Sequence, residues 1–409
     1  MTQTKWPPRF PRRFTFDKDQ PDMDRKHPIV VFLDSNDYSD LSNPKRSEAM
    51  EETRRLLVDL SKSPSVSFTF SGTLISEMAP LESKYTDYAA ARTDLMIELC
   101  GRNTFLSYDR IIKAEIARLS SMDDTPIVST NDDGTWFPDI GGVMTPMQFI
   151  GATSAINEKG VELGLNRKER RALNCKASRH GRFRKKFVEG YGEFDLTEIL
   201  SRYPMRPDDA KVIMDYTLGR ATAEQAHRAF LESMRDPRWM MRWFHEHYDR
   251  LGIIGDWVRA PSDKFIAVFS DMIEAGNESN GIDLLSTAGW QSQADQMAIT
   301  LINRLLQSEH PTSPPCHDTS LIGRYCPGFS TMMSVMNSSL RNSFGPKARK
   351  MKRNDFVDAM HAMYAPYANV FRADAYMAPI VRKRVVQYQT TVVEKVEMLP
   401  AVIQELMQD

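Results

Sequence analysis

The sequence predicts an α/β protein whose parallel-sheet core is assembled from both ends of the chain around a large, mostly helical insertion. Short apolar runs alternate with segments of helical periodicity from residue 29 to about residue 120, which is typical of parallel β-α units. Helical periodicity dominates the middle of the chain, from about 144 to 307. The alternation returns after residue 354, so we expect the two ends to share one sheet.

The amino-terminal elements follow from this pattern. Residues 1–27 contain several prolines and no apolar period, so we expect an extended arm. The run IVVFLD at 29–34 is continuously apolar and rich in β-branched residues, which suits a strand buried on both faces of a sheet. The next expected elements are a helix at about 47–62, a strand at 65–72, a helix that starts at TLISEMA with Glu77 in its first turns and continues over 85–100, and a strand at 103–108.

Two segments rich in helix-breaking residues, 121–142 and 307–320, lie on either side of the helical middle. The pattern therefore divides the chain into an arm (1–27), a core (28–120 and 345–409) and an insertion (121–344). The expected carboxyl-terminal elements are a helix at 354–367, a strand at 369–374, a helix in AYMAPIVRKR, a strand in TTVVEKVEML and a terminal helix in PAVIQELMQ.

Composition narrows the classes of function. Lys and Arg number 53 against 54 Asp and Glu in 409 residues, so attraction to a polyanion must come from local clusters. Four cysteines do not make a disulfide scaffold, and we expect reduced thiols in a cytoplasmic protein without a secretory signal. No apolar run reaches the roughly 20 residues of a membrane span. The phosphate-binding loop of ATPases and the G-x-S-x-G turn of serine hydrolases are absent from the sequence.

Acidic residues occur where the predicted strands end. Ligands of open parallel sheets bind outside the carboxyl ends of the strands. Carboxylates crowded there repel one another unless divalent cations neutralise them, and oxygen ligands favour Mg²⁺ or Mn²⁺. The sequence therefore predicts a metal site built from two residues that follow strands, Asp34 and Asp374, and two in neighbouring helices, Glu77 and Asp358.

Each of these acids also has an ordinary structural explanation, since an Asp after a strand is commonly a turn or cap residue. Asp355 is an alternative third ligand, because it shares a helix face with Asp358 one turn later. His361, one further turn along, is expected to position the metal site or a phosphate, or else to pack in the core. Asp37 and Asp40 have two explanations, a position near the metal site or a solvated turn, and the sequence favours the turn for both.

The order of these residues resembles that of PIN-like nucleases. The opening VVFLDSN contains an Asp-x-Asn pair, Asp34 and Asn36, and in that superfamily the Asp binds metal while the Asn orients it. GTLISEMA supplies the Glu that follows the second strand. DAMHAMYAPYANVFRAD supplies the last two acids, and its His-x-x-Tyr-x-Pro-Tyr segment is similar to that of a bacterial subgroup. The resemblance covers about 29–120 and 345–395.

The resemblance implies a metal-dependent endonuclease in which Mg²⁺ or Mn²⁺ activates water for in-line attack on a phosphodiester, without a covalent intermediate. It implies RNA rather than DNA as substrate. It also implies a role as a toxin or anti-phage effector, restrained by a protein partner or by self-assembly. The sequence departs from the common pattern at Arg372, where many relatives have Thr, and at Asn369, where an acid is frequent.

Basic clusters provide a candidate surface for nucleic acid. Residues 166–187 carry ten Lys or Arg against one Glu, and 341–353 form a second cluster before the helix of Asp358. The alternative is a solvated helix or basic loop. The candidate phosphate contacts are Arg182, Arg184, Lys185, Lys186, Arg349, Lys350, Lys352 and Arg353.

Three other readings remain open: a nuclease acting on DNA, a non-catalytic module that binds nucleic acid, and a helical scaffold whose acids are simply exposed. The distances between the four acids distinguish a metal-dependent nuclease from the non-catalytic module and from the scaffold. The acids of a nuclease must lie close together, because two-metal sites need ions roughly 4 Å apart. The remaining His and Cys residues lack the spacing of structural zinc sites.

Overall fold

The computed structural model describes residues 28–79, 85–137, 152–179, 182–184, 205–217, 220–246, 287–342 and 353–408. Their centre is a four-stranded parallel sheet with the order β2-β1-β7-β8. Strands from both ends of the chain therefore share one sheet, and the predicted α/β class is confirmed. The strands are β1 (Ile29–Phe32), β2 (Val66–Phe68), β7 (Val370–Arg372) and β8 (Thr391–Val393). The predicted arm, residues 1–27, lies outside the described residues.

The two ends of the chain are joined where β1 pairs with β7. β1 and β7 pair in parallel with Val31 opposite Val370. Asn369 ties the two strands together at their start, because its side-chain Oδ1 accepts from Val30 N at 2.8 Å and its own N–H donates to Val30 O at 2.9 Å. Next to the edge strand β2, Phe70 forms a parallel bridge to Thr104 in β3 (Thr104–Phe105). β3 in turn pairs antiparallel with β4 (Thr130–Asn131).

The first helices differ from the sequence prediction in two respects. The helix expected to run from TLISEMA to residue 100 is two separate helices, and Glu77 lies in the last turn of the first one rather than in its first turns. A short helix that was not predicted follows β1 directly. The helices of this part are α1 (Ser35–Ser42), α2 (Glu48–Leu60), α3 (Gly72–Met78), α4 (Thr86–Cys100) and α5 (Tyr108–Ser121).

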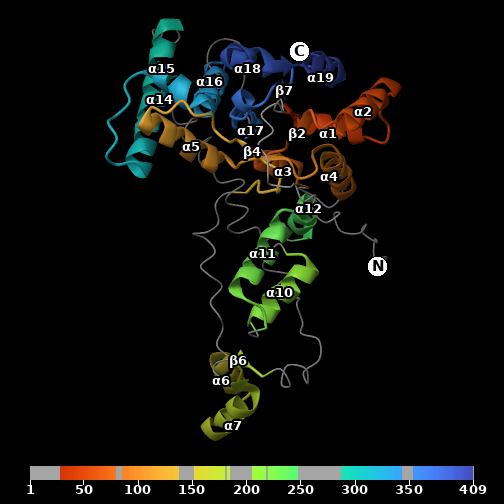
Figure 1. Ribbon diagram of the computed structural model, residues 1–409, viewed down its shortest axis with the longest axis vertical. Coiled ribbons are helices and arrows are strands. Elements are labelled where there is room, and N and C mark those ends of the chain that lie inside the picture. The colour runs from red at the N-terminus through yellow and green to blue at the C-terminus, as the bar shows by residue number, and fades with distance from the viewer. Residues whose placement is uncertain are drawn as a thin grey trace, which may run out of the picture.

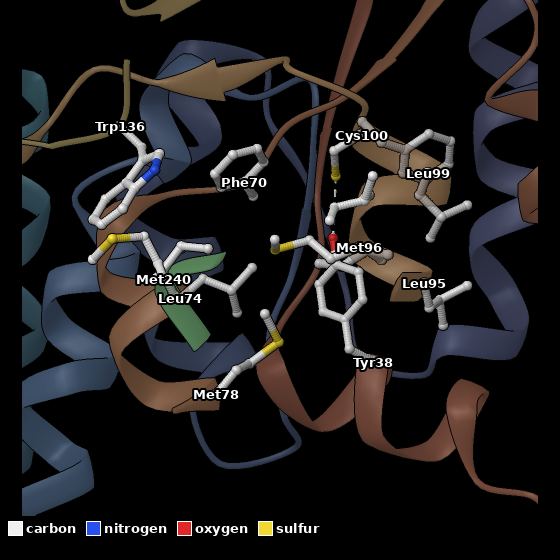
Figure 2. Packing of buried hydrophobic residues seen from close by; sticks show 14 of the residues in the cluster. Tyr38, Phe70, Leu74, Met78, Leu95, Met96, Leu99, Cys100, Trp136 and Met240 are labelled. Atoms are coloured by element: carbon white, nitrogen blue, oxygen red, sulfur yellow. Dashed lines mark hydrogen bonds between the residues drawn. The ribbon is translucent and has the colours of Figure 1, made fainter. Parts of the chain in front are cut away.

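The sheet separates two hydrophobic clusters, because alternate side chains of β1 point to opposite faces. Val31 belongs to the cluster under α1, α2 and α4, where Tyr38 Oη and Cys100 Sγ lie 3.3 Å apart (Figure 2). Phe32 belongs to the other cluster and stacks on Phe371 with ring centroids 5.0 Å apart. β1 is thus buried on both faces, as its apolar run predicted.

The helical middle of the chain contributes to both clusters. Ile302 and Met333 share a cluster with Phe105 and Phe371, and Met240 shares the other with Leu74. Described helices of the segment 121–344 therefore pack into the same clusters as the sheet. These helices are α10 (Pro207–Thr217), α11 (Ala223–Met234), α12 (Pro237–Glu246), α14 (Thr287–Glu309), α15 (Thr319–Tyr325) and α16 (Pro327–Arg341).

One part of the middle lies apart from the sheet, at the lower end of the molecule in Figure 1. It is not wholly helical, because α7 leads into a two-stranded antiparallel ribbon inside the basic run. Its elements are α6 (Ala152–Glu162), α7 (Arg167–Ala177), β5 (Ser178–Arg179) and β6 (Arg182–Phe183).

The carboxyl-terminal part returns to the sheet. Its elements are α17 (Arg353–Ala362), η3 (Ala365–Tyr367), α18 (Ala378–Val385), η4 (Val386–Tyr388), η5 (Val396–Met398) and α19 (Leu399–Gln408). Within the described part of the chain, no helix combines the length and the apolar character needed to cross a membrane.

A buried carboxylate joins α5 to the start of α16. Glu115 is fully buried, and its oxygens accept from Gly328 N at 2.5 Å, from Phe329 N at 3.0 Å and from the Tyr367 hydroxyl. The first N–H groups of a helix have no partner within the helix, so a carboxylate placed there satisfies them. Burial nevertheless opposes ionisation and raises the pKa of Glu115 to about 7.

Candidate metal centre

The topology of the sheet selects one place for a ligand. From β1 the chain passes to β2 on one side, while β7 pairs with the opposite side of β1 and is followed by β8. The carboxyl ends of β1 and β7 therefore flank the point where the strand order reverses, where open parallel sheets bind their ligands. Asp34 and Asp374 each stand two residues beyond the end of one of these strands.

Asp34 is held in place by the helix that it caps. Its Oδ1 accepts from Ser35 N at 2.7 Å, and its Oδ2 accepts from the side-chain amide of Asn36 at 3.2 Å. In return, Asp37 accepts from Asp34 N at 3.0 Å, which completes a capping box at the start of α1. Asn36 therefore contacts the carboxylate oxygen of Asp34 that does not accept from Ser35 N.

Glu77 and His361 meet beside Asp34. His361 Nε2 lies 3.1 Å from Glu77 Oε2, and the imidazole is only 4% exposed. One ligand atom from each of Asp34, Glu77 and His361 lies within 4.8 Å of the other two. These atoms come from α3, α17 and the end of β1, so the tertiary fold assembles a group that could hold a metal ion.

Asp358 and Asp374, two of the four predicted ligands, are not among the ligand atoms that meet within 4.8 Å, but their charges act at the site. Burial raises the pKa of Asp358 to about 7; the charges of Asp34, Glu77 and Asp374 add to the increase, and that of His361 opposes it. All four predicted acids therefore interact electrostatically. Asp374 lies at the exposed edge, where its Oδ1 accepts from Met377 N at 2.7 Å.

The same crowding acts on Asp34, and its pKa is raised by burial and by the charge of Glu77, against the opposing charge of His361. Glu77 behaves differently, because the hydrogen bond and charge of His361 outweigh burial and lower its pKa. The pKa of His361 is raised in turn, since its acidic neighbours outweigh burial. The site thus contains a Glu77–His361 ion pair beside two carboxyl groups that resist ionisation.

The sequence favoured a solvated turn for Asp37, and this expectation was wrong, because Asp37 is only 1% exposed. The capping box turns its side chain inward, where Arg372 Nε lies 3.0 Å from its Oδ1. Burial still raises the pKa of Asp37 to about 7, with the charge of Asp34 adding to the effect and that of Arg372 opposing it. Arg372 thus supplies a buried partner to an acid beside the site. Asp40 is exposed, as expected.

A second cation near the site, Arg92 of α4, was missed by the sequence reasoning. It donates to Ser39 Oγ and Met78 O at 3.3 Å, and its charge contributes to the lowered pKa of Glu77. No motif distinguishes Arg92 in the sequence. For Asp37, the D-x-x-D spacing of the capping box was a usable signal.

The remaining predicted residues are not part of this group. Asp355 is 1% exposed on α17, and the cluster of ligand atoms found among the described residues does not include it. Arg184 is exposed after the β5–β6 ribbon, which contains Arg182, and Arg353 begins α17. Lys185, Lys186, Arg349, Lys350 and Lys352 lie outside the described residues.

The donor set fits a divalent cation. Carboxylate oxygens suit Mg²⁺ and Mn²⁺, and an additional imidazole is tolerated better by Mn²⁺. Burial is the largest cause of the raised pKa values of Asp34 and Asp358, and a bound cation would favour their ionised forms.

We therefore expect Mn²⁺, and more weakly Mg²⁺, to raise the melting temperature. A ligand that binds only the native state adds about 2.7 kcal/mol at roughly 100 times its Kd. Asp374→Asn should lose most of this gain, and should melt higher than wild type in EDTA because a repelling charge is gone. The exposed Asp40→Asn variant serves as the matched control. A melting curve that millimolar Mn²⁺ leaves unchanged would argue against the metal centre.

Comparisons with protein-family models, with curated proteins and with solved structures found no match. The geometry and chemistry of the site itself are the basis on which a function can be assigned.

Proposed function

We propose that this protein is a metal-dependent nuclease that hydrolyses phosphodiester bonds, acting on RNA in preference to DNA. The observation that carries the proposal is the convergence of Asp34, Glu77 and His361 within 4.8 Å, beside Asp358, at the carboxyl ends of β1 and β7. The preference for RNA and a role as a toxin or anti-phage effector in the cytoplasm follow from the resemblance to PIN-like nucleases.

In this proposal, Asp34, Glu77 and Asp358 hold Mg²⁺ or Mn²⁺, with Asp374 at the exposed edge. When bound, the cation supplies Lewis acidity, which lowers the pKa of water and neutralises charge on the phosphate. Asp34 is oriented by the α1 cap and by Asn36.

The other residues of the site complete this arrangement. His361 holds the proton that pairs it with Glu77 and so keeps that carboxylate ionised and aligned. No Ser or Cys nucleophile is needed, because water attacks the phosphorus directly. The substrate enters from the side of Asp374, since this acid alone among the four is classed as exposed.

The test is an assay with the full chain and end-labelled RNA and DNA of matched sequence. We expect internal cleavage in Mn²⁺ or Mg²⁺, none in EDTA, and faster loss of RNA than of DNA. Preferential cleavage of DNA would correct the substrate. Binding of either nucleic acid without cleavage in any metal would instead support a non-catalytic binding module.

A further inference from the structure

A cavity of about 700 Å³ lies among α14, α15, α16, the end of α18 and η4. Its size is within the range of pockets that hold small organic ligands. The residues that form it belong to none of the groups assigned to the metal centre. Its chemistry therefore requires a separate explanation.

One wall of the cavity is a polar stripe on α16. The opposite face of this helix is in the core, where Phe329 and Leu340 are buried. Positions spaced one helical turn apart bring polar side chains to the same face. The stripe consists of Ser330, Ser334, Asn337, Ser338 and Arg341, all of which line the cavity.

Asn337 is the most informative member of the stripe. Its side chain is only 7% exposed, yet no partner for its amide exists among the residues that the structure describes. The amide is nevertheless open to water from the cavity, because it is not among the fully buried polar atoms that lack a partner in the described part of the chain. Asn337 also faces the cavity, so a ligand there would supply the missing hydrogen bonds.

The cavity is also cationic. Arg324, Arg341 and Arg384 line it against one acid, Asp295, which accepts a hydrogen bond from Gln291 at 2.8 Å. Arg324 is paired with Asp124. Arg384 is exposed at the rim, and the described part of the chain contains no partner for it. A guanidinium in this position is suited to bind phosphate.

Aromatic side chains complete the lining. Trp290 and Tyr388 both line the cavity, and the Tyr388 hydroxyl donates to Gly323 O at 2.7 Å, which holds its ring in place. The lining matches one class of ligand. Its arginines suit a phosphate, its hydroxyl and amide groups suit a sugar and the edge of a base, and its indole suits stacking on a base. We propose that this cavity binds a phosphorylated nucleoside, either as a free nucleotide or as the end of a nucleic-acid strand.

A chain of contacts links the cavity to the metal centre. Arg341 ends the polar stripe, and the next residue, Asn342, donates to the Tyr376 hydroxyl at 3.0 Å. Tyr376 N in turn donates to Asp374 Oδ1 at 3.0 Å. A nucleotide in the cavity is thus placed to influence the exposed edge of the metal centre, although its binding does not depend on the proposed nuclease activity.

The test measures binding by the full chain in EDTA, so that it stands whether or not the metal centre is active. The probes are AMP, ATP, adenosine, inorganic phosphate and a 5′-phosphorylated pentanucleotide. We expect a nucleotide to bind more tightly than adenosine or phosphate. Binding of AMP or ATP identifies a free nucleotide as the ligand, and binding of the pentanucleotide alone identifies the end of a strand.

Arg384→Ala should weaken nucleotide binding about tenfold, the usual loss for one hydrogen bond to a charged group. Lys383→Ala is the matched control, because Lys383 is the adjacent exposed cation and does not line the cavity. Equal affinities in wild type and Arg384→Ala, or no binding of any nucleotide, would overturn the proposal.

Asn337→Leu keeps the size of the side chain and removes its amide. We expect it to melt close to the wild-type temperature without ligand, because no hydrogen bond to the described residues is lost, and to bind nucleotide about tenfold more weakly. If Asn337→Leu melts lower and binds as wild type does, Asn337 is a structural residue and the proposal fails.

Discussion

Asp34→Asn is expected to reduce cleavage by about a thousandfold or more, the scale seen when one preorganised electrostatic group is removed from an active site. Asn cannot supply the negative charge that a divalent cation requires. The fold should be unaffected, because Asn caps helices as well as Asp does and can still accept from Ser35 N.

The metal-free protein should even gain stability from this change. The pKa of Asp34 is raised in the folded chain, so ionised Asp34 costs stability as the pH rises from 3.8 through the raised value, and Asn removes that cost. Cleavage rates and melting curves in EDTA, at neutral pH, measure the two effects. Asp40→Asn, an exposed acid on the same helix, should behave like wild type. Asp34→Asn that still cleaves at a tenth of the wild-type rate would exclude this residue as a ligand.

Glu115→Ala should lower the free energy of unfolding by about 4 kcal/mol. The change leaves three buried donors without an acceptor: Gly328 N, Phe329 N and the Tyr367 hydroxyl. Each buried donor that loses its partner costs about 1–3 kcal/mol. Against a total stability of about 5–15 kcal/mol, this loss is large. Denaturant titration measures it, and the exposed Lys113→Ala on the same helix should change stability by less than about 0.5 kcal/mol.

The pH dependence gives a second measurement. The pKa of Glu115 rises from 4.5 to about 7 on folding, so the native state keeps a proton that the unfolded chain releases. Wild type should therefore lose a component of its stability as the pH rises from about 4.5 to 7. Glu115→Gln should lack this component. If the two proteins show parallel stability profiles over this range, Glu115 does not titrate as its burial requires.

These two changes affect connected parts of the molecule. The N-terminus of α16, which Glu115 holds, belongs to a helix that packs against α17, and α17 carries Asp358 and His361. Glu115→Ala should therefore reduce cleavage only in proportion to the unfolded fraction, whereas Asp34→Asn should act on a fully folded protein.

Several features of the protein were determined by the sequence alone. The apolar run of 29–34 predicted a strand buried on both faces, and β1 is such a strand. The alternation of strands and helices at both ends predicted one parallel sheet. Once β1 and β7 are parallel neighbours, Asp34 and Asp374 must reach the same edge. These inferences succeeded because they depend on local periodicity and on the polarity of strands, which short stretches of sequence encode.

Other features were decided only by tertiary contacts. Asp37 looked solvated, but the fold places Arg372, more than 300 residues away, against its carboxylate. Arg92 approaches Glu77 through the packing of α4 on α3. The helices of 287–342 join the main core although their sequence resembled an insertion, and their polar stripe lines a cavity. Local patterns record which residues are polar or apolar. The partner of a buried charge is set by contacts between distant segments, which only the folded chain brings together.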